Sequence, residues 1–129
     1  MAPDLRRSRG SLGESIAADH LRDAGYEIVE RNFRTRRGEI DVIATDARAI
    51  VFCEVKTRIA GGRSGPALAL DAIGPAKRRR LRSLAIEWLH GRREAGEAPW
   101  RRHLRFDAIG ITLSPGGRLL ALEHLEDAF

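Results

Sequence analysis

Lysine is nearly absent from this chain, which uses arginine for almost every cation. Two lysines, Lys56 and Lys77, stand beside twenty-one arginines. Arginine keeps its proton, whereas the pKa of a lysine ammonium shifts with its surroundings. Lys56 closes the run Glu54-Val55-Lys56, and an adjustable ammonium two residues after a carboxylate suits a metal-dependent, phosphodiester-cleaving site. The alternative is chance survival of two lysines in an arginine-biased chain.

Cysteine and long apolar runs are also scarce, and each absence excludes a class of protein. The single cysteine, Cys53, excludes an internal disulfide framework and a cysteine-rich zinc site. Residues 1–10 carry charges without an apolar core, so we expect no secretory signal. No apolar stretch is long enough to cross a bilayer. We therefore expect a cytoplasmic protein without a membrane partner.

The remaining composition is that of a small globular domain with a basic surface. The chain has 129 residues, of which 43% are hydrophobic and 32% are charged, and its formal net charge is +5. This length fits one domain with one core. The positive charge favours an anionic partner, nucleic acid before an acidic membrane surface, although a merely solvated surface would look the same.

Hydrophobic periodicity predicts the order α-β-β-β-α-β-β, a mixed α/β sheet flanked by helices. We expect a flexible basic arm over residues 1–10 and a single domain over 11–129. The first helix is expected to begin at Ser11, where Ser11 and Glu14 form a capping-box pattern, and to end at Gly25. The other expected segments are strands over 26–35, 38–45, 49–58, 102–113 and 118–124, a helix over 75–90, a loop over 59–74 and a linker over 91–101.

Two predicted strands bring charged side chains together. Residues alternate faces along a strand, so Glu54 and Lys56 share one face. If the hairpin loop before them has two or four residues, Asp41 falls opposite Glu54, with Cβ atoms about 5 Å apart. A divalent cation such as Mg²⁺ or Mn²⁺ would relieve the repulsion between these carboxylates, and Lys56 could orient water or stabilise the phosphate. The alternative is a partly buried ion-pair cluster.

Two further acids have two interpretations each. Glu14 is either only the capping-box acid or an inward-pointing third carboxylate at the flank of the apolar stripe. Asp107, in Arg105-Phe106-Asp107, could lie near the site, although an ion pair at a strand edge is favoured.

The second predicted helix begins with cations. Lys77 lies over the buried stripe of that helix, and Lys77, Arg78, Arg79 and Arg80 all sit near its N-terminus, where cations oppose the helix dipole. Free amides and clustered cations at a helix start form a phosphate site, whereas the alternative is a solvated charge run. We assign these four residues and Arg58 to nucleic-acid binding.

Several short motifs in combination resemble the YraN-like family of small bacterial proteins. That family is placed in the PD-(D/E)xK nuclease superfamily and is similar to archaeal Holliday junction resolvases. The resemblance covers about residues 10–125, and the matching segments are Gly13-Glu14 with Ala17, Arg31-Asn32 with Arg34, Gly38-Glu39-Ile40-Asp41, Phe52-Cys53-Glu54-Val55-Lys56-Thr57-Arg58, Lys77 and Arg105-Phe106-Asp107.

The resemblance implies a restriction-endonuclease-like fold and a set of roles. Asp41, Glu54 and the backbone carbonyl of Val55 would be metal ligands, and Lys56 would be the catalytic lysine. Glu14 matches the acid that many branches of the superfamily carry on the first helix. Lys77 matches the polar residue that they carry on the helix after the central strands. Ile40 stands where the superfamily name has proline, a residue that the chemistry does not require.

Together these patterns predict a Mg²⁺- or Mn²⁺-dependent nuclease acting on DNA, with branched or structured DNA as the expected substrate. Two alternatives stay open: a nucleic-acid-binding module that does not cleave, and an accessory protein of DNA metabolism whose basic helix contacts an acidic partner. Analogy with the resolvases alone adds the hypothesis of a homodimer.

Overall fold

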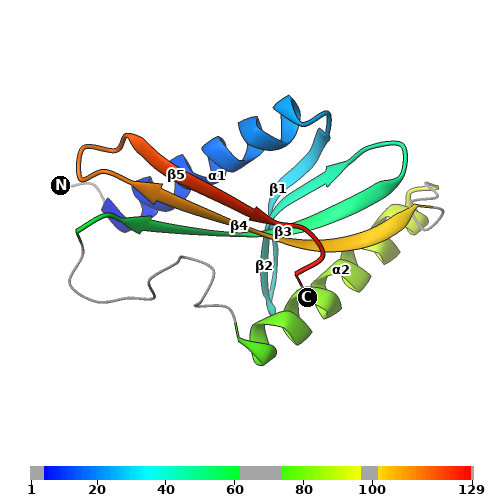
Figure 1. Ribbon diagram of the computed structural model, residues 1–129. Helices are drawn as coiled ribbons and strands as arrows, with labels where there is room; N and C mark the ends of the chain where they lie inside the picture. The colour runs from blue at the N-terminus through cyan, green and yellow to red at the C-terminus, as the bar shows by residue number, and fades with distance from the viewer. Residues whose placement is uncertain (1–4, 62–73, 97–101, 129) are drawn as a thin grey trace.

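The computed structural model describes residues 5–61, 74–96 and 102–128, which form a five-stranded sheet between two helices (Figure 1). The elements confirm the predicted fold class and its order α-β-β-β-α-β-β. They are α1 (Leu5–Asp23), β1 (Glu27–Thr35), β2 (Gly38–Thr45), β3 (Ala49–Ile59), α2 (Pro75–Glu94), β4 (His103–Leu113) and β5 (Leu119–Leu125).

The strands lie in the sheet in the order in which they occur along the chain. Strands β3 and β4 pair in parallel, and the other neighbouring strands pair antiparallel. A parallel pair needs a long crossover connection, and α2 lies within it. Strand β3 is therefore central, with β2 on one side and β4 on the other.

Each helix covers one face of the sheet (Figure 1). Alternation along β3 divides its side chains between the two faces: Val51 and Cys53 pack in the cluster under α1, whereas Ile50 and Phe52 pack in the cluster under α2. The ring of Phe52 is edge-on to Trp88 of α2 at 5.7 Å between centroids. Burial of both faces explains why β3 reads as an almost continuous apolar run.

Both helices are longer than predicted. The helix α1 begins at Leu5, so the predicted start at Ser11 is wrong and Ser11 and Glu14 lie inside the helix. Residues 5–10 consist largely of leucine and arginine, which are good helix formers, while residues 1–4 lie outside the described part. Helix α2 continues to Glu94, into the predicted linker, and most of the predicted loop lies outside the described residues. Neither helix that the structure describes is long and apolar enough to span a membrane.

Candidate functional site

The pairing of β2 with β3 ends just before the two predicted carboxylates. Val42 lies opposite Cys53, and four residues separate the paired ends of the hairpin. The prediction required a hairpin loop of two or four residues, and the loop has four. Continuing the same register by one residue on each strand places Asp41 opposite Glu54. The Val55 amide donates a hydrogen bond of 2.8 Å to Oδ2 of Asp41. The Asp41 carboxylate is therefore fixed against the backbone of β3.

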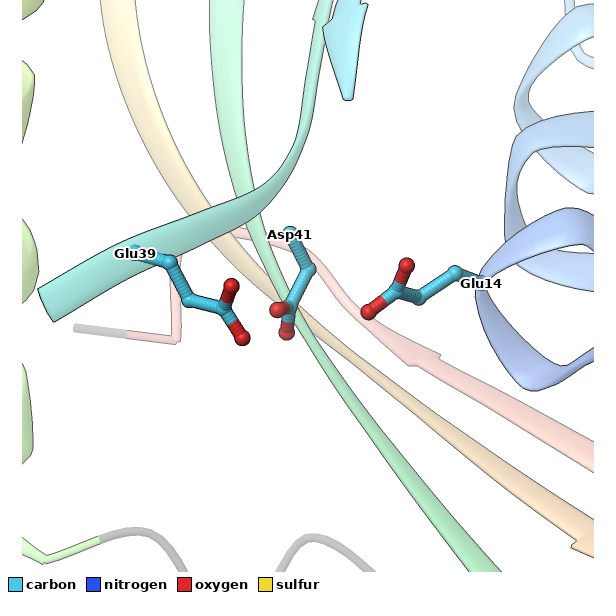
Figure 2. A group of neighbouring side chains, drawn as sticks. All are labelled: Glu14, Glu39 and Asp41. Carbon is cyan, nitrogen blue, oxygen red and sulfur yellow. The ribbon is translucent and has the colours of Figure 1, made fainter. Parts of the chain in front are cut away.

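Three carboxylates converge at this point (Figure 2). Glu14, Glu39 and Asp41 each place one oxygen within 4.8 Å of the other two. Glu14 comes from α1, and the other two lie on β2, so the interpretation of Glu14 as an inward-pointing carboxylate is confirmed. Glu39 was not predicted. The available signal was its position two residues before Asp41, which puts both side chains on one side of the strand.

Glu54 lies beside this group and is paired with a lysine. Its Oε1 is 2.5 Å from Nζ of Lys77, and its side chain is only 9% exposed. Lys77 reaches it from the first turn of α2. The position of Lys77 over the buried stripe indicated an anion nearby, and in the structure that anion is the protein's own carboxylate.

Burial and repulsion from neighbouring carboxylates raise the pKa of two of these acids, Asp41 and Glu14. Burial, followed by the charge of Glu54, raises the pKa of Asp41 to about 8. Burial also raises the pKa of Glu14. A cation relieves such strain by stabilising the charged forms, and hard carboxylate oxygens are the ligands that Mg²⁺ and Mn²⁺ take in proteins. The donor set therefore fits the predicted divalent cation.

The two lysines differ in how firmly they hold their protons. Burial, followed by contact with Lys77, lowers the pKa of Lys56. Burial also disfavours the charge of Lys77, but the hydrogen bond to Glu54 and its negative charge outweigh burial and raise the pKa of Lys77. Lys56 is therefore the adjustable ammonium that the scarcity of lysine suggested, and Lys77 is a firmly charged partner of Glu54.

A cavity of about 200 Å³ opens between the carboxylates on β2 and β3 and the helix α2. Since one water takes up about 30 Å³ in the liquid, this volume accommodates a phosphate group with some of its hydration. Its polar walls are formed by Glu39, Asp41, Glu54, Lys77 and Arg80.

Two glycines let the elements approach closely at the site. A Cβ at Gly13 would lie 1.8 Å from Oγ1 of Thr57, so α1 rests directly on β3 one residue before Glu14. Gly38 has a φ of +141°, and a Cβ there would lie 3.0 Å from Cδ of Arg80. Each glycine thus directly precedes one of the converging carboxylates.

The other residues assigned to nucleic-acid binding lie on β3 and α2. Arg58 is exposed, and its Nε donates to Oγ1 of Thr112 at 3.2 Å. Arg78, Arg79 and Arg80 are exposed on the N-terminal part of α2. Their role in binding stays a prediction, as does that of the Val55 carbonyl.

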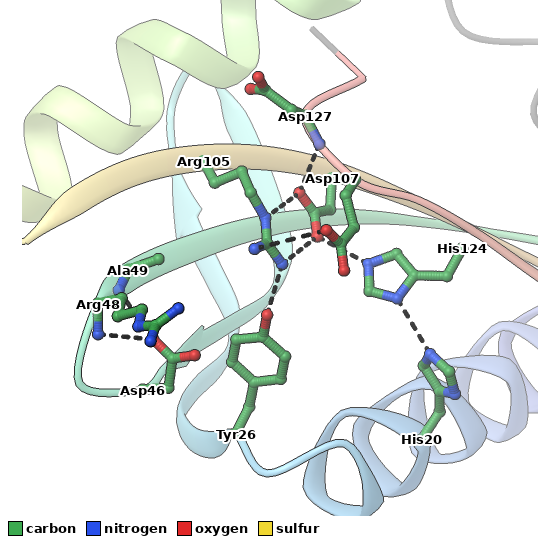
Figure 3. Close-up of polar contacts among 10 residues, drawn as sticks. His20, Tyr26, Asp46, Arg48, Ala49, Arg105, Asp107, His124 and Asp127 are labelled. Atoms are coloured by element: carbon green, nitrogen blue, oxygen red, sulfur yellow. Dashed lines mark hydrogen bonds and ion pairs between the residues drawn. The ribbon is translucent and has the colours of Figure 1, made fainter.

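A second polar cluster lies on the face of the sheet that α1 covers (Figure 3). Asp107 is fully buried and pairs with Arg105 through two contacts of 2.9 Å. Its Oδ2 lies 2.7 Å from Nε2 of His124, and the Asp127 amide donates to Oδ1 at 2.9 Å. The ion-pair interpretation of Asp107 is therefore confirmed, although the pair is buried and not at a strand edge. The residue is not part of the carboxylate group.

Comparison with known proteins gives one consistent result. The chain matches the uncharacterised protein family UPF0102 over residues 13–111, a span that contains every predicted site residue. It is 43% identical to a UPF0102 protein of Nocardia farcinica over 124 residues, which is 96% of this chain and 91% of the relative. It is 42% identical to a UPF0102 protein of Geobacter metallireducens over 123 residues, 95% and 93% of the two chains. The YraN-like family is the same family, so the resemblance is confirmed. The chain belongs to the UPF0102 family.

Proposed function

We propose that this protein is a divalent-metal-dependent nuclease that hydrolyses phosphodiester bonds in DNA, with branched or otherwise structured DNA as its substrate. The observation that carries the proposal is the convergence of Glu14, Glu39 and Asp41. Two of these acids, Glu39 and Asp41, line one cavity together with Glu54 and Lys77. Burial raises the pKa of Asp41 and Glu14 and lowers the pKa of Lys56, and such perturbed groups are typical of functional sites.

The metal would be Mg²⁺ or Mn²⁺, held by Asp41 and Glu54, with the Val55 carbonyl as a further ligand. Glu14 and Glu39 add negative charge that favours a divalent cation over a monovalent one. When bound, such an ion stabilises charge on the phosphate and makes a water more acidic.

The chain's own residues perform the remaining tasks. Lys56 donates a hydrogen bond to the oxygens that gain negative charge as water attacks phosphorus in line with the leaving group. Asp41 is held in place by the Val55 amide, so the acids are arranged before substrate arrives. Lys77 and Arg80, on the wall of the cavity, attract and orient the phosphate.

The basic start of α2 would contact neighbouring phosphates. Arg78 and Arg79 are exposed beside the cavity-lining cations, and the net charge of the chain is +5. Binding through phosphates releases counterions, so affinity for DNA should fall steeply as salt increases.

Cleavage of a panel of labelled junction, flap, single-stranded and duplex DNAs with Mg²⁺ or Mn²⁺ tests the proposal. We expect cutting by the wild-type protein and by the control Asp19→Asn, whose side chain is 74% exposed on α1. Asp41→Asn and Lys56→Met should bind DNA without cutting it. Equal cutting by all four proteins would assign the activity to another site or to a contaminant.

A specific observation favours a second candidate, a nucleic-acid-binding module that does not cleave. The 2.5 Å ion pair with Lys77 neutralises Glu54, and a neutralised carboxylate is a poorer metal ligand. Salt-sensitive DNA binding by the wild type without cleavage of any substrate would support this candidate. Loss of both activities would instead favour an accessory protein with an acidic protein partner.

Analogy with the resolvases also supports a homodimer, in which two copies would present two sites to a branched substrate. Sedimentation equilibrium at working concentration tests this hypothesis, and a monomer in the presence and absence of DNA would contradict it.

A further inference from the structure

The ion pair between Lys77 and Glu54 joins a predicted phosphate ligand to a predicted metal ligand. We propose that Lys77 is an exchangeable counter-ion, which neutralises Glu54 in the free protein and moves to a DNA phosphate when the substrate binds. Glu54 then becomes available to the cation. This inference rests on the proposed function, because it requires DNA and a divalent cation at the same site.

The exposure of the two partners indicates which one moves. The Glu54 side chain is 9% exposed and is fixed on the central strand, whereas the Lys77 side chain is 38% exposed at the start of α2. A lysine ammonium is carried by a flexible four-carbon stem with three rotatable donors. Lys77 can therefore turn towards solvent or a phosphate while Glu54 stays in place.

The charges around the pair explain why the exchange needs both ligands. Glu39 and Asp41 line the same cavity as Glu54, so withdrawal of Lys77 alone would leave a largely buried carboxylate without its partner, which is costly. An incoming cation removes that cost.

The consequence is reciprocal coupling between two ligands. DNA that takes Lys77 makes Glu54 available and tightens metal binding, and metal on Glu54 releases Lys77 and tightens DNA binding by the same factor. Since a partly exposed ion pair is worth on the order of 1 kcal/mol, its share of this coupling is about fivefold in affinity.

Binding of Mn²⁺, measured from the electron paramagnetic resonance signal of the free ion, tests the coupling with and without a short DNA duplex. Lys77→Met keeps the length of the side chain and removes the charge. Without DNA, we expect Lys77→Met to bind Mn²⁺ about fivefold more tightly than the wild type. The factor by which DNA tightens Mn²⁺ binding should be about fivefold smaller in this variant than in the wild type. The control Arg22→Met removes an exposed cation of α1, whose side chain is 53% exposed, and should retain the wild-type coupling.

A second comparison needs no metal and no stable Lys77 variant. In EDTA, the Glu54→Gln substitution releases Lys77 from its ion pair. The affinity of this variant for the DNA duplex should therefore be about fivefold higher than that of the wild type. Glu39→Gln removes an equal charge from the same cavity without freeing Lys77, since Glu39 pairs with Arg34, and should change affinity less. If Lys77→Met fails to fold, this comparison decides alone.

The outcomes separate this inference from the proposed function. Equal DNA affinities of Glu54→Gln and Glu39→Gln, or wild-type coupling in a folded Lys77→Met, would overturn the exchange while leaving a nuclease site intact. A wild-type protein that binds neither Mn²⁺ nor DNA would overturn the proposed function and the exchange together.

Discussion

Replacing Gly13 with alanine tests whether direct contact between α1 and β3 positions Glu14. The added Cβ would lie 1.8 Å from Oγ1, 3.0 Å from Cβ and 3.2 Å from Cγ2 of Thr57. Rotation of this branched side chain cannot clear the space, because its own Cβ stays too close and it carries two heavy atoms there. The helix must therefore move away from the strand, and Glu14 moves with it, away from Asp41.

The expected loss of stability follows from two opposing effects. Overpacking costs typically about 1–3 kcal/mol, and a contact this short belongs at the upper end. Alanine in place of glycine inside a helix contributes about 1 kcal/mol in the other direction. We therefore expect Gly13→Ala to lower the free energy of unfolding by about 2 kcal/mol.

Gly10 in the same helix provides a matched control, because no atom lies within 4 Å of a Cβ added there. Gly10→Ala should raise the free energy of unfolding by about 1 kcal/mol, so urea unfolding should separate the two variants by about 3 kcal/mol. Adding Thr57→Ala to Gly13→Ala should recover part of the loss, because it removes Oγ1 and Cγ2 of Thr57 and keeps only Cβ. A Gly13→Ala protein as stable as Gly10→Ala would refute the close contact of α1 with β3.

Two other perturbations give independent tests. Glu39→Gln should weaken Mn²⁺ binding at least about tenfold, the loss typical even of a residue that only orients a metal ligand, whereas Asp19→Asn should bind Mn²⁺ like the wild type; equal affinities would remove Glu39 from the site. Asp107→Asn should lower the free energy of unfolding by about 3 kcal/mol, because it takes from the largely buried Arg105 its buried carboxylate partner. Burial opposes ionisation of Asp107, but hydrogen bonds from His124 and Arg105 hold its pKa below the ordinary 3.8. The stability that this carboxylate contributes is therefore complete above about pH 3.8 and is lost as the pH falls through the lower pKa of the folded state; urea midpoints of Asp107→Asn should show less of this acid-side loss, and an unchanged profile would contradict the assignment.

Local patterns predicted most of the sheet and the centre of the site. The bounds of β2 were predicted as observed, since its alternation is bounded by a glycine with positive φ and by a turn at Asp46. The register that brings Asp41 to Glu54 depended only on an even hairpin loop, and the loop is even.

Features that depend on distant contacts were not predicted. The capping-box pattern at Ser11 is a local signal, but helix formers before it carry α1 back to Leu5. The need for glycine at position 13 arises from Thr57, which lies on another element. The partner of Lys77 was missed for the same reason, because an angular position on a helix indicates an anion without identifying it.

The most direct test of the central claim is the single-turnover rate of DNA cleavage in Mg²⁺ by the wild type and Lys56→Arg, both saturated with DNA. Arginine keeps the positive charge but has neither the compact shape nor the adjustable pKa of lysine. We expect cleavage by the wild type and a loss of at least about 100-fold in Lys56→Arg, the scale of losing one well-placed hydrogen-bond donor to the developing negative charge, with DNA affinity retained. Absence of cleavage by the wild type, or cleavage by Lys56→Arg at the wild-type rate, would contradict this expectation.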